Sequence, residues 1–235
     1  MQFRVSRIVV SLMLALVLAA PAAMAQDKNP NASEDKTAKV SDEAKRLEAL
    51  AMAAQLAEYG RANQSAVALL TAAQIMKNTP VTEATKAKTT EGEGKGDAKG
   101  KGELDTPEKL LAEAKTLAKG NAKLIEVIEQ EMKQGSTRQV VNGPIRILEN
   151  VKAGYSDIYK EFVFKGNERA GVLVIGDGDA DIDLFVYDQN GNLIGKDIDR
   201  TSRCLVEWSP RWQGPFTIKI RNLGNVSSNY LMYIP

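Results

Sequence analysis

The chain has 235 residues and a formal net charge of +1 at pH 7, from 31 basic and 30 acidic side chains. It contains no histidine and a single cysteine, Cys204, which excludes imidazole general bases, histidine-ligated zinc and an internal disulfide. The balanced charge argues against nucleic-acid binding, which needs a basic surface to displace counterions, so we expect no nucleic-acid partner.

Residues 1–25 are typical of a signal peptide. Arg4 and Arg7 precede an almost unbroken apolar run over residues 8–20, and small residues follow up to Ala25. We therefore predict cleavage after Ala25 and a periplasmic or secreted mature protein with a formal charge of −1. An uncleaved membrane anchor is the alternative, but the run is short for a bilayer crossing of about 20 residues. No later segment is apolar enough to cross, so we expect no stable membrane span after cleavage.

The next part of the chain changes from a polar leader to helices. Residues 26–40 are polar and predict a disordered leader. Ser41 and Asp42 are candidates for a helix N-cap, and apolar residues follow at helical spacing until Gly60, which we expect to end the helix. A second helix should end before Pro80, so residues 41–80 predict an antiparallel helical hairpin.

Residues 81–105 predict a flexible linker or an inserted loop. The stretch 89–102 is rich in glycine, lysine and glutamate, and it has no large apolar side chain whose burial could offset the cost of ordering. Helical spacing resumes at Thr106-Pro107 and is interrupted at Gly120-Asn121, so residues 106–135 form either one bent helix or a second hairpin. The helices weakly resemble tetratricopeptide-like pairs, and a small bundle that packs on itself is the alternative.

Over residues 139–235, polar and apolar residues alternate in seven or eight short segments separated by turn residues such as Gly143-Pro144 and Gly224-Asn225. Many short strands without intervening helices predict an antiparallel sandwich, jelly roll or barrel. The predicted fold class is therefore α+β with segregated parts: N-terminal helical hairpins followed by a C-terminal antiparallel β-sandwich.

One stretch of this C-terminal part matches a known pattern. Residues 181–192 read D-I-D-L-F-V-Y-D-Q-N-G-N, and Glu207-Trp208, Gly214-Pro215-Phe216 and Asn229-Tyr230 follow in order. This resembles the bacterial pre-peptidase C-terminal domain over residues 151–235. The resemblance implies a small non-catalytic, jelly-roll-like sandwich of exported proteins. Some relatives bind calcium, and some bind fibrous or polymeric substrates such as collagen.

The same stretch can be interpreted from its alternation. Ile182, Leu184 and Val186 share one face of a strand and belong in the core, whereas Phe185 and Tyr187 share the other face. The aromatic face is either a ligand-contact platform or packs beneath a neighbouring segment. The motif hairpin turn that follows consists of Asp188, Asn190, Gly191 and Asn192, in which Asn190-Gly191 should supply the positive backbone angles of a tight turn.

Acidic residues recur at every second position before and within this strand, at Asp177, Asp179, Asp181 and Asp183. Carboxylates this close repel one another unless they are solvated, protonated or bridged by a cation. Oxygen ligands in a chain without histidine suit calcium, so one interpretation is a calcium site, with Asp199 as a further ligand. The other interpretation is a solvated acidic loop.

Two tryptophans flank a turn near the C-terminus. Alternation places Cys204 and Trp208 together in the core, so the thiol should be a buried small hydrophobe, and a dimer-forming disulfide is the alternative. Trp212 follows the turn and, with Arg211, forms a candidate ligand-contact pair, because these residue types dominate binding hot spots. Closing the end of the sandwich is the alternative role for both.

Together these features predict an exported, non-catalytic binding or adaptor protein. The sandwich would bind a protein, peptide or glycan in the cell envelope or outside it, with calcium as a candidate cofactor, and the helices would contact a protein. A structural envelope or assembly component is the second hypothesis. A carboxylate-based hydrolase is the third, although no nucleophile motif accompanies the acids.

Overall fold

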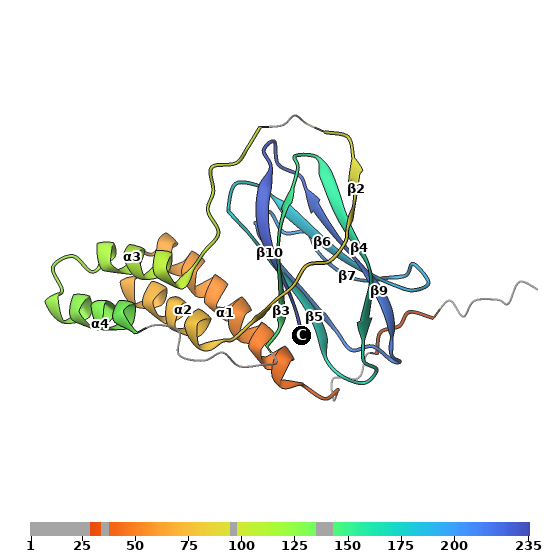
Figure 1. Cartoon of the computed structure of the whole chain (residues 1–235), viewed down its shortest axis with the longest axis horizontal. Helices are drawn as coiled ribbons and strands as arrows, with labels where there is room; N and C mark the ends of the chain where they lie inside the picture. The colour runs from red at the N-terminus through yellow and green to blue at the C-terminus, as the bar shows by residue number, and fades with distance from the viewer. Residues whose placement is uncertain (1–28, 34–37, 95–97, 135–142) are drawn as a thin grey trace, which may run out of the picture.

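The structure is a computed structural model of the chain, and it describes residues 29–33, 38–94, 98–134 and 143–235. The signal peptide expected over residues 1–25 lies outside these ranges. A helical bundle lies at one side of the molecule and a two-layered β-sandwich at the other (Figure 1). The segregated α+β organisation predicted from the sequence is therefore confirmed.

Each helix begins at a capping side chain. Ser41, Ser65, Thr106 and Asn121 each accept a hydrogen bond from the backbone N–H three residues later, as N-cap residues do. None of the described helices is both long and apolar enough to span a membrane. The helices are α1 (Asp42–Ala62), α2 (Ala66–Asn78), α3 (Pro107–Leu117) and α4 (Ala122–Lys133).

Gly60 lies inside α1, so the expectation that it ends the helix is wrong. A Cβ atom at this position would come within 2.7 Å of the Leu69 side chain, so glycine allows α1 and α2 to approach closely. The chain reverses a few residues later, at Gln64, whose φ is +51°. The residue that looked like a stop signal is therefore a helix-packing residue.

Residues 106–135 form two helices rather than one bent helix. Gly120, with a φ of +90°, lies in the turn between α3 and α4. Ile128 of α4 packs in one buried cluster with Leu110 of α3 and Leu69 of α2. The four helices thus share a core of their own, and the second hairpin is the alternative that the structure adopts.

The sandwich consists of two five-stranded sheets, ordered β1-β3-β10-β5-β8 and β2-β4-β9-β6-β7. All strand pairs are antiparallel except β1 with β3. The sheets do not close into a barrel. The strands are β1 (Thr82–Glu83), β2 (Thr89–Gly92), β3 (Ile145–Val151), β4 (Tyr155–Phe164), β5 (Ala170–Gly176), β6 (Ile182–Asp188), β7 (Leu193–Asp197), β8 (Arg203–Trp208), β9 (Gly214–Asn222) and β10 (Ser228–Ile234).

The predicted alternation sets which side chains fill the space between the sheets. Ile182, Leu184 and Val186 of β6 are fully buried there, in one cluster with Val172 of β5 and Ile218 of β9. Burying these side chains removes apolar surface from water and stabilises the two layers. The strands predicted within residues 139–235 are therefore confirmed as the body of the sandwich.

The segment expected as a flexible linker differs most from its prediction. Within residues 81–105, β1 pairs in parallel with β3 and β2 pairs antiparallel with β4, so the segment adds one edge strand to each sheet. Both added strands expose their side chains, so the pairing rests on backbone hydrogen bonds, together with the Glu83–Arg146 ion pair and the Thr90–Asp157 hydrogen bond. A search for apolar alternation cannot find such strands. Over the described residues the sandwich consequently has ten strands rather than seven or eight.

Between β1 and β2 the chain crosses from one sheet to the other. Lys88, on this crossing segment, pairs with one carboxylate from each sheet. Its Nζ lies 2.6 Å from a carboxylate oxygen of Asp157, which is 1% exposed, and 2.9 Å from Glu149. Asp157 also accepts a hydrogen bond from Tyr230 at 2.9 Å, and the hydroxyls of Tyr230 and Tyr159 lie 2.6 Å apart. Because Asp157 lies on β4 and Tyr230 on β10, this buried network connects the two sheets.

Helix α1 joins the bundle to the sandwich. Leu47 and Leu50 pack against Leu173, Leu231 and Tyr233 on the outer face of one sheet. Glycine at position 171 makes room for this contact, because a Cβ there would lie 2.7 Å from Leu47. Ion pairs Glu48–Arg169 and Glu58–Arg203 flank the apolar contact. The bundle is therefore packed onto the sandwich.

Candidate functional site

The first two predicted calcium ligands in the sequence, Asp177 and Asp179, follow β5. The buried Asp177 carboxylate accepts hydrogen bonds from the Ser228 hydroxyl at 2.6 Å and from the Asn229 backbone N–H at 2.7 Å. The exposed Asp179 carboxylate accepts one from the Gly102 backbone N–H. Both acids therefore bind other segments of the chain.

Asp181 directly precedes β6, and Asp183 is the second residue of this strand. One oxygen of Asp181 is buried without a hydrogen-bond partner among the described residues. Asp183 is 5% exposed, and its pKa is raised by burial and by the neighbouring Asp181 charge, while Arg221 opposes the shift. Asp199 is exposed and accepts hydrogen bonds from the Thr201 hydroxyl and backbone N–H.

These acids do not converge as chelating ligands do. Within the described ranges, no group of three or more histidine, cysteine, aspartate or glutamate side chains is arranged to hold a metal ion. A calcium ion takes six to eight oxygen ligands, so carboxylates already bonded to Ser228, Asn229 and Gly102 would have to be redirected. Calcium binding stays a prediction.

A cleft of about 480 Å³, which we call the junction cleft, lies where the bundle meets the sandwich. Residues 101–103 form part of its wall, and the glycines of the stretch 98–102 permit a very close approach to the sandwich. A Cβ at Gly102 would lie 2.2 Å from the Asp177 carbonyl oxygen, and one at Gly100 would lie 2.6 Å from the Ser227 carbonyl oxygen. The glycines that suggested flexibility therefore hold this stretch against the β5–β6 loop. The cleft is lined by Ala54, Glu58, Arg61, Lys101, Gly102, Glu103, Asp105, Lys109, Ile175, Gly176, Asp177, Gly178, Ser202 and Arg203.

Most charges around the junction cleft are paired with one another. Arg61 binds Asp105 at 2.5 Å and Glu113 at 2.8 Å, and these carboxylates raise its pKa despite partial burial. Arg203 binds Glu58 at 3.2 Å. Carboxylates held by guanidinium groups are poor proton carriers, so the cleft is better suited to binding a polar ligand than to acid–base chemistry.

The motif hairpin turn is organised by Asp188. Its carboxylate accepts hydrogen bonds at 2.9 Å from the backbone N–H groups of Asn190 and Asn192 and from the Asn192 side chain. Gly191 has a φ of +80°, while Asn190 does not have the positive φ expected for it. The aspartate and the glycine of the motif are thus explained by the geometry of the β6–β7 turn.

The same turn contacts the beginning of the described chain, residues 29–33, which we call the N-terminal strap. The side chain of Asn31 is fully buried and lies against the loop that carries Arg211 and Trp212. Further along, the backbone of Lys39 exchanges hydrogen bonds with residues 167–169. The described parts of the leader are therefore bound to the sandwich, and the expectation of disorder does not hold for them.

The candidate ligand-contact pair Arg211 and Trp212 thus binds the chain itself. Their backbone N–H groups donate to Asn31, and the Arg211 side chain donates to the Ala32 carbonyl oxygen at 2.7 Å. The Trp212 side chain is 37% exposed. The alternative role, closing the end of the sandwich, matches these contacts, with the N-terminal strap as the closing element.

The other candidate pair lies on the outer face of β6. The rings of Phe185 and Tyr187 stack at an interplanar angle of 19°, with centroids 6.5 Å apart, and both side chains are half-buried. Lys219 of β9 and Lys196 of β7 are the register neighbours of Phe185. The platform interpretation stays open at this face.

Cys204 lies inside the sandwich, as predicted. Its thiol donates to the Ile182 carbonyl oxygen at 2.9 Å, and burial raises its pKa. Trp208 is also in the core, where its ring contacts Phe164 edge-on at 4.8 Å between centroids. A thiol that is buried and hard to ionise is a poor nucleophile.

The structure adds one surface that sequence reasoning missed. An open groove of about 520 Å³, which we call the bundle groove, lies between the end of α1, the start of α2 and α3. Leu117, an apolar residue of α3, is 37% exposed here. Periodicity cannot separate a core position from a groove position on the same helix face. The groove is lined by Arg61, Gln64, Leu69, Ala112, Glu113, Thr116 and Leu117.

No family model matches the sequence, and no curated protein matches it either. Among solved structures, the chain is similar to the pre-peptidase C-terminal domain of a collagenase from Bacillus anthracis, with 8% identity and a TM-score of 0.24 over 39% of this chain and 76% of that one. Another match is the Yersinia pseudotuberculosis-derived mitogen, with 14% identity and a TM-score of 0.23 over 34% of this chain and 83% of that one. A pre-peptidase C-terminal domain is thus among the structures similar to this chain. Similarity at TM-scores this low supports no argument about ligands, so the function is argued from the geometry of the clefts and contacts described above.

Proposed function

We propose that the protein is an exported, non-catalytic binding or adaptor protein, in which the sandwich is the base and the helical bundle holds a protein partner. The bundle groove is the observation that carries this proposal. Helices α3 and α4 project to the side of the molecule opposite the sandwich, which leaves the groove open (Figure 1). Apolar surface left open in this way is typical of protein interaction sites.

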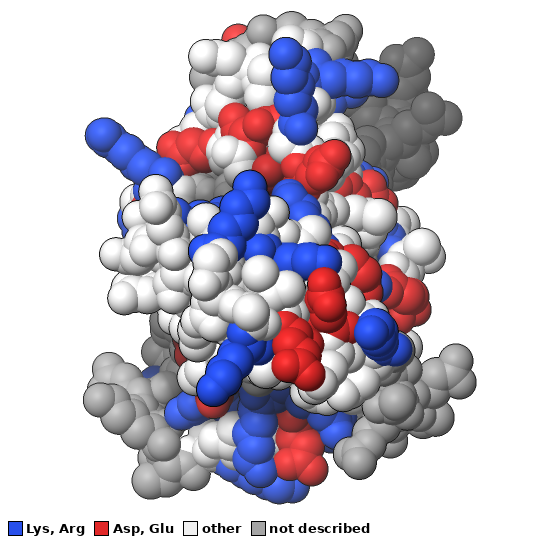
Figure 2. Space-filling model, turned by 90° about the vertical axis from the view of Figure 1, so that its left-hand side faces the viewer, with Lys and Arg blue, Asp and Glu red and all other residues white. Residues whose placement is uncertain are grey.

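The chemistry of the groove favours an amphipathic partner. Leu69 and Leu117 give the groove an apolar floor, and the Arg61–Glu113 ion pair lies at its rim. A helix or short peptide with an apolar anchor and polar flanks would fit both parts. Figure 2 shows this end of the molecule with basic and acidic side chains interspersed, which favours a partner of mixed charge.

Three features support binding over catalysis. The chain has no histidine, and its one thiol is buried and bonded to a carbonyl oxygen. Asp177, one of the acids of the hydrolase alternative, is held by Ser228 and Asn229. A general base must be free to reach the proton that it removes. For the sandwich we propose a protein, peptide or glycan ligand, and thermal melting with and without millimolar calcium tests whether the ion contributes.

The second candidate is a structural envelope or assembly component. The observation in its favour is the packing of α1 on the sandwich, because a sandwich that serves assembly would bind its own helices. Sedimentation of the mature protein separates the two candidates. Self-association at micromolar concentration without any captured partner would favour the structural role.

The adaptor proposal is tested by capture from an envelope extract of the source cell with the mature full chain as bait. Leu117→Glu places a charge in the bundle groove and should abolish capture of the partner. Val163→Glu is the matched control, because Val163 is an exposed apolar residue on the sandwich. Val163→Glu should capture as the wild type does. Equal capture by Leu117→Glu and the wild type would refute the groove as the partner site.

A further inference from the structure

We propose that the sandwich carries a second binding site, specific for an asparagine in an extended peptide, and that the N-terminal strap occupies it as a displaceable internal ligand. The site, which we call the asparagine pocket, is formed by Asp188, Arg211, Trp212 and Gly214. It lies on the sandwich, away from the helical residues of the bundle groove. The proposal is therefore independent of the partner proposed for the bundle.

The asparagine pocket binds both the oxygen and the nitrogen of a side-chain carboxamide. The Asn31 Oδ1 accepts hydrogen bonds from the backbone N–H groups of Arg211 at 2.9 Å and Trp212 at 3.1 Å. The Asn31 Nδ2 donates to the Trp212 carbonyl oxygen at 3.0 Å. An aspartate would place a carboxylate oxygen against that carbonyl oxygen, and a buried acceptor facing an acceptor is costly.

The shape of the pocket fits the same side chain. A Cβ on Gly214 would lie 3.3 Å from the Asn31 Nδ2, so glycine leaves room for the amide. A glutamine would extend one methylene further into this wall, and a serine would not reach the Trp212 carbonyl oxygen. The pocket therefore selects asparagine among the common polar residues by distance as well as by hydrogen-bond pattern.

Three further contacts are made to peptide backbone. The Asn31 N–H donates to the Asp188 carboxylate at 2.9 Å, and the Ser33 N–H donates to the Ser209 carbonyl oxygen at 2.7 Å. The Arg211 Nε donates to the Ala32 carbonyl oxygen at 2.7 Å. Any extended peptide offers these backbone groups, so they bind a peptide without regard to its sequence, and the contacts of the Asn31 side chain supply specificity.

The strap is bound in a way that allows exchange. Asn31 is its one fully buried residue, whereas Asn29 and Pro30 are exposed and Ala32 and Ser33 are half-buried. Segments that bury little apolar surface open at low free energy. The pocket does not depend on the strap, because Asp188 is held by Asn190 and Asn192 and the 209–213 loop is held by a hydrogen bond from the Asn167 N–H to the Pro210 carbonyl oxygen.

An external peptide must compete with the strap. A ligand tethered by a short chain segment has an effective concentration of roughly millimolar. The apparent affinity for an external peptide is reduced by the fraction of molecules whose pocket is occupied. Opening the strap should therefore unmask binding that is weak in the wild type.

The first experiment tests whether Asn31→Asp opens the strap in the mature full chain. Hydrogen exchange should show faster exchange of the Arg211 and Trp212 amides in this variant, while the amides of β9 keep their protection. Asn225→Asp, the same change at an exposed turn residue, should leave all of them unchanged. Unchanged Arg211 and Trp212 amides in Asn31→Asp would overturn the proposed role of the strap. Asn31→Ala repeats the test without a charge beside Asp188.

The second experiment uses a peptide with the sequence of residues 28–35, KNPNASED, with blocked ends. In calorimetric titrations, Asn31→Asp and Asn31→Ala should bind this peptide at least about tenfold more tightly than the wild type or Asn225→Asp. The same peptide with aspartate at its fourth position should not bind. Absence of binding to the opened variants, or equal binding of both peptides, would overturn the asparagine pocket. Neither result would affect the bundle groove.

Discussion

Asp183 and Asp188, five residues apart on β6, have opposite electrostatic environments. Burial opposes ionisation of Asp188, but hydrogen bonds from the Asn192 side chain and from the backbone N–H groups of Asn31, Asn192 and Asn190 outweigh it and lower its pKa. Asp183 is buried beside Asp181, and its pKa is raised. The surroundings of Asp188 therefore stabilise its ionised form, whereas those of Asp183 destabilise the ionised form.

The two pKa shifts predict opposite effects of charge removal on stability. A lowered pKa in the folded state contributes stability above the unfolded value of about 4 and loses it as the pH falls through the folded pKa. Asp188→Asn should therefore destabilise by about 1–3 kcal/mol at pH 7, with a smaller deficit at pH 3. A raised pKa contributes stability at low pH and loses it as the pH rises, so Asp183→Asn should stabilise by about 1 kcal/mol at pH 7 and have little effect at pH 3.

Urea unfolding of the two variants at pH 7 and pH 3 checks this pair. Each variant removes one carboxylate from the same strand, so each is the control for the other. Effects of the same sign at pH 7, or effects that do not change with pH, would contradict the environments described for Asp183 and Asp188.

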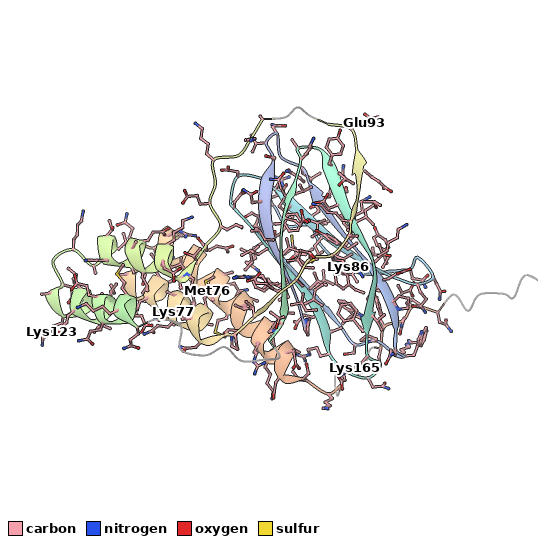
Figure 3. The ribbon with its side chains drawn as sticks, in the orientation of Figure 1. Met76, Lys77, Lys86, Glu93, Lys123 and Lys165 are labelled. Atoms are coloured by element: carbon pink, nitrogen blue, oxygen red, sulfur yellow. The ribbon has the colours of Figure 1, made fainter. Side chains whose placement is uncertain are left out.

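At the scale of the elements, the segment that crosses between the sheets is the least expected feature. Figure 3 labels Lys86 on this segment, two residues before Lys88. Lys86 lies over the Phe162 ring at 5.0 Å, near the surface, whereas Lys88 compensates the buried charge of Asp157. The two lysines therefore have different roles although they occur in the same stretch.

Lys88→Met should destabilise the protein strongly, because removing one member of a buried ion pair leaves an uncompensated charge. The expected loss is about 3 kcal/mol, and Lys86→Met should lose less than about 1 kcal/mol. Chemical unfolding of both variants at pH 7 measures the difference. A loss for Lys88→Met no greater than that for Lys86→Met would show that the crossing segment does not stabilise the sandwich.

The sequence predicted the elements that bury side chains and missed those held by the backbone. Alternation located β6 because Ile182, Leu184 and Val186 all face the core. It missed β1 and β2 because their side chains are exposed and show no apolar alternation. In the candidate site, Asp188 was recognised through its motif, but its contact with Asn31 joins residues 157 positions apart, which no local pattern reveals.

On the scale of the whole molecule, the described segments assemble on the sandwich. The N-terminal strap, the crossing segment and the stretch around Gly100 each bind a different part of it, and α1 packs on its outer face. This arrangement forms the junction cleft and fixes the direction in which the bundle groove opens. If residues 81–105 formed a free linker, the junction cleft would lack the wall that Lys101, Gly102 and Glu103 provide.

Hydrogen exchange across residues 81–102 of the mature chain tests this organisation most directly. The Thr82 and Ala84 amides donate to the carbonyl oxygens of Pro144 and Arg146, and the Gly100 amide donates to that of Ser227. We predict that these three amides, and the β2 amides that face β4, exchange at least about tenfold more slowly than in an unstructured peptide of the same sequence. Exchange at the unstructured rate throughout the segment would contradict the account.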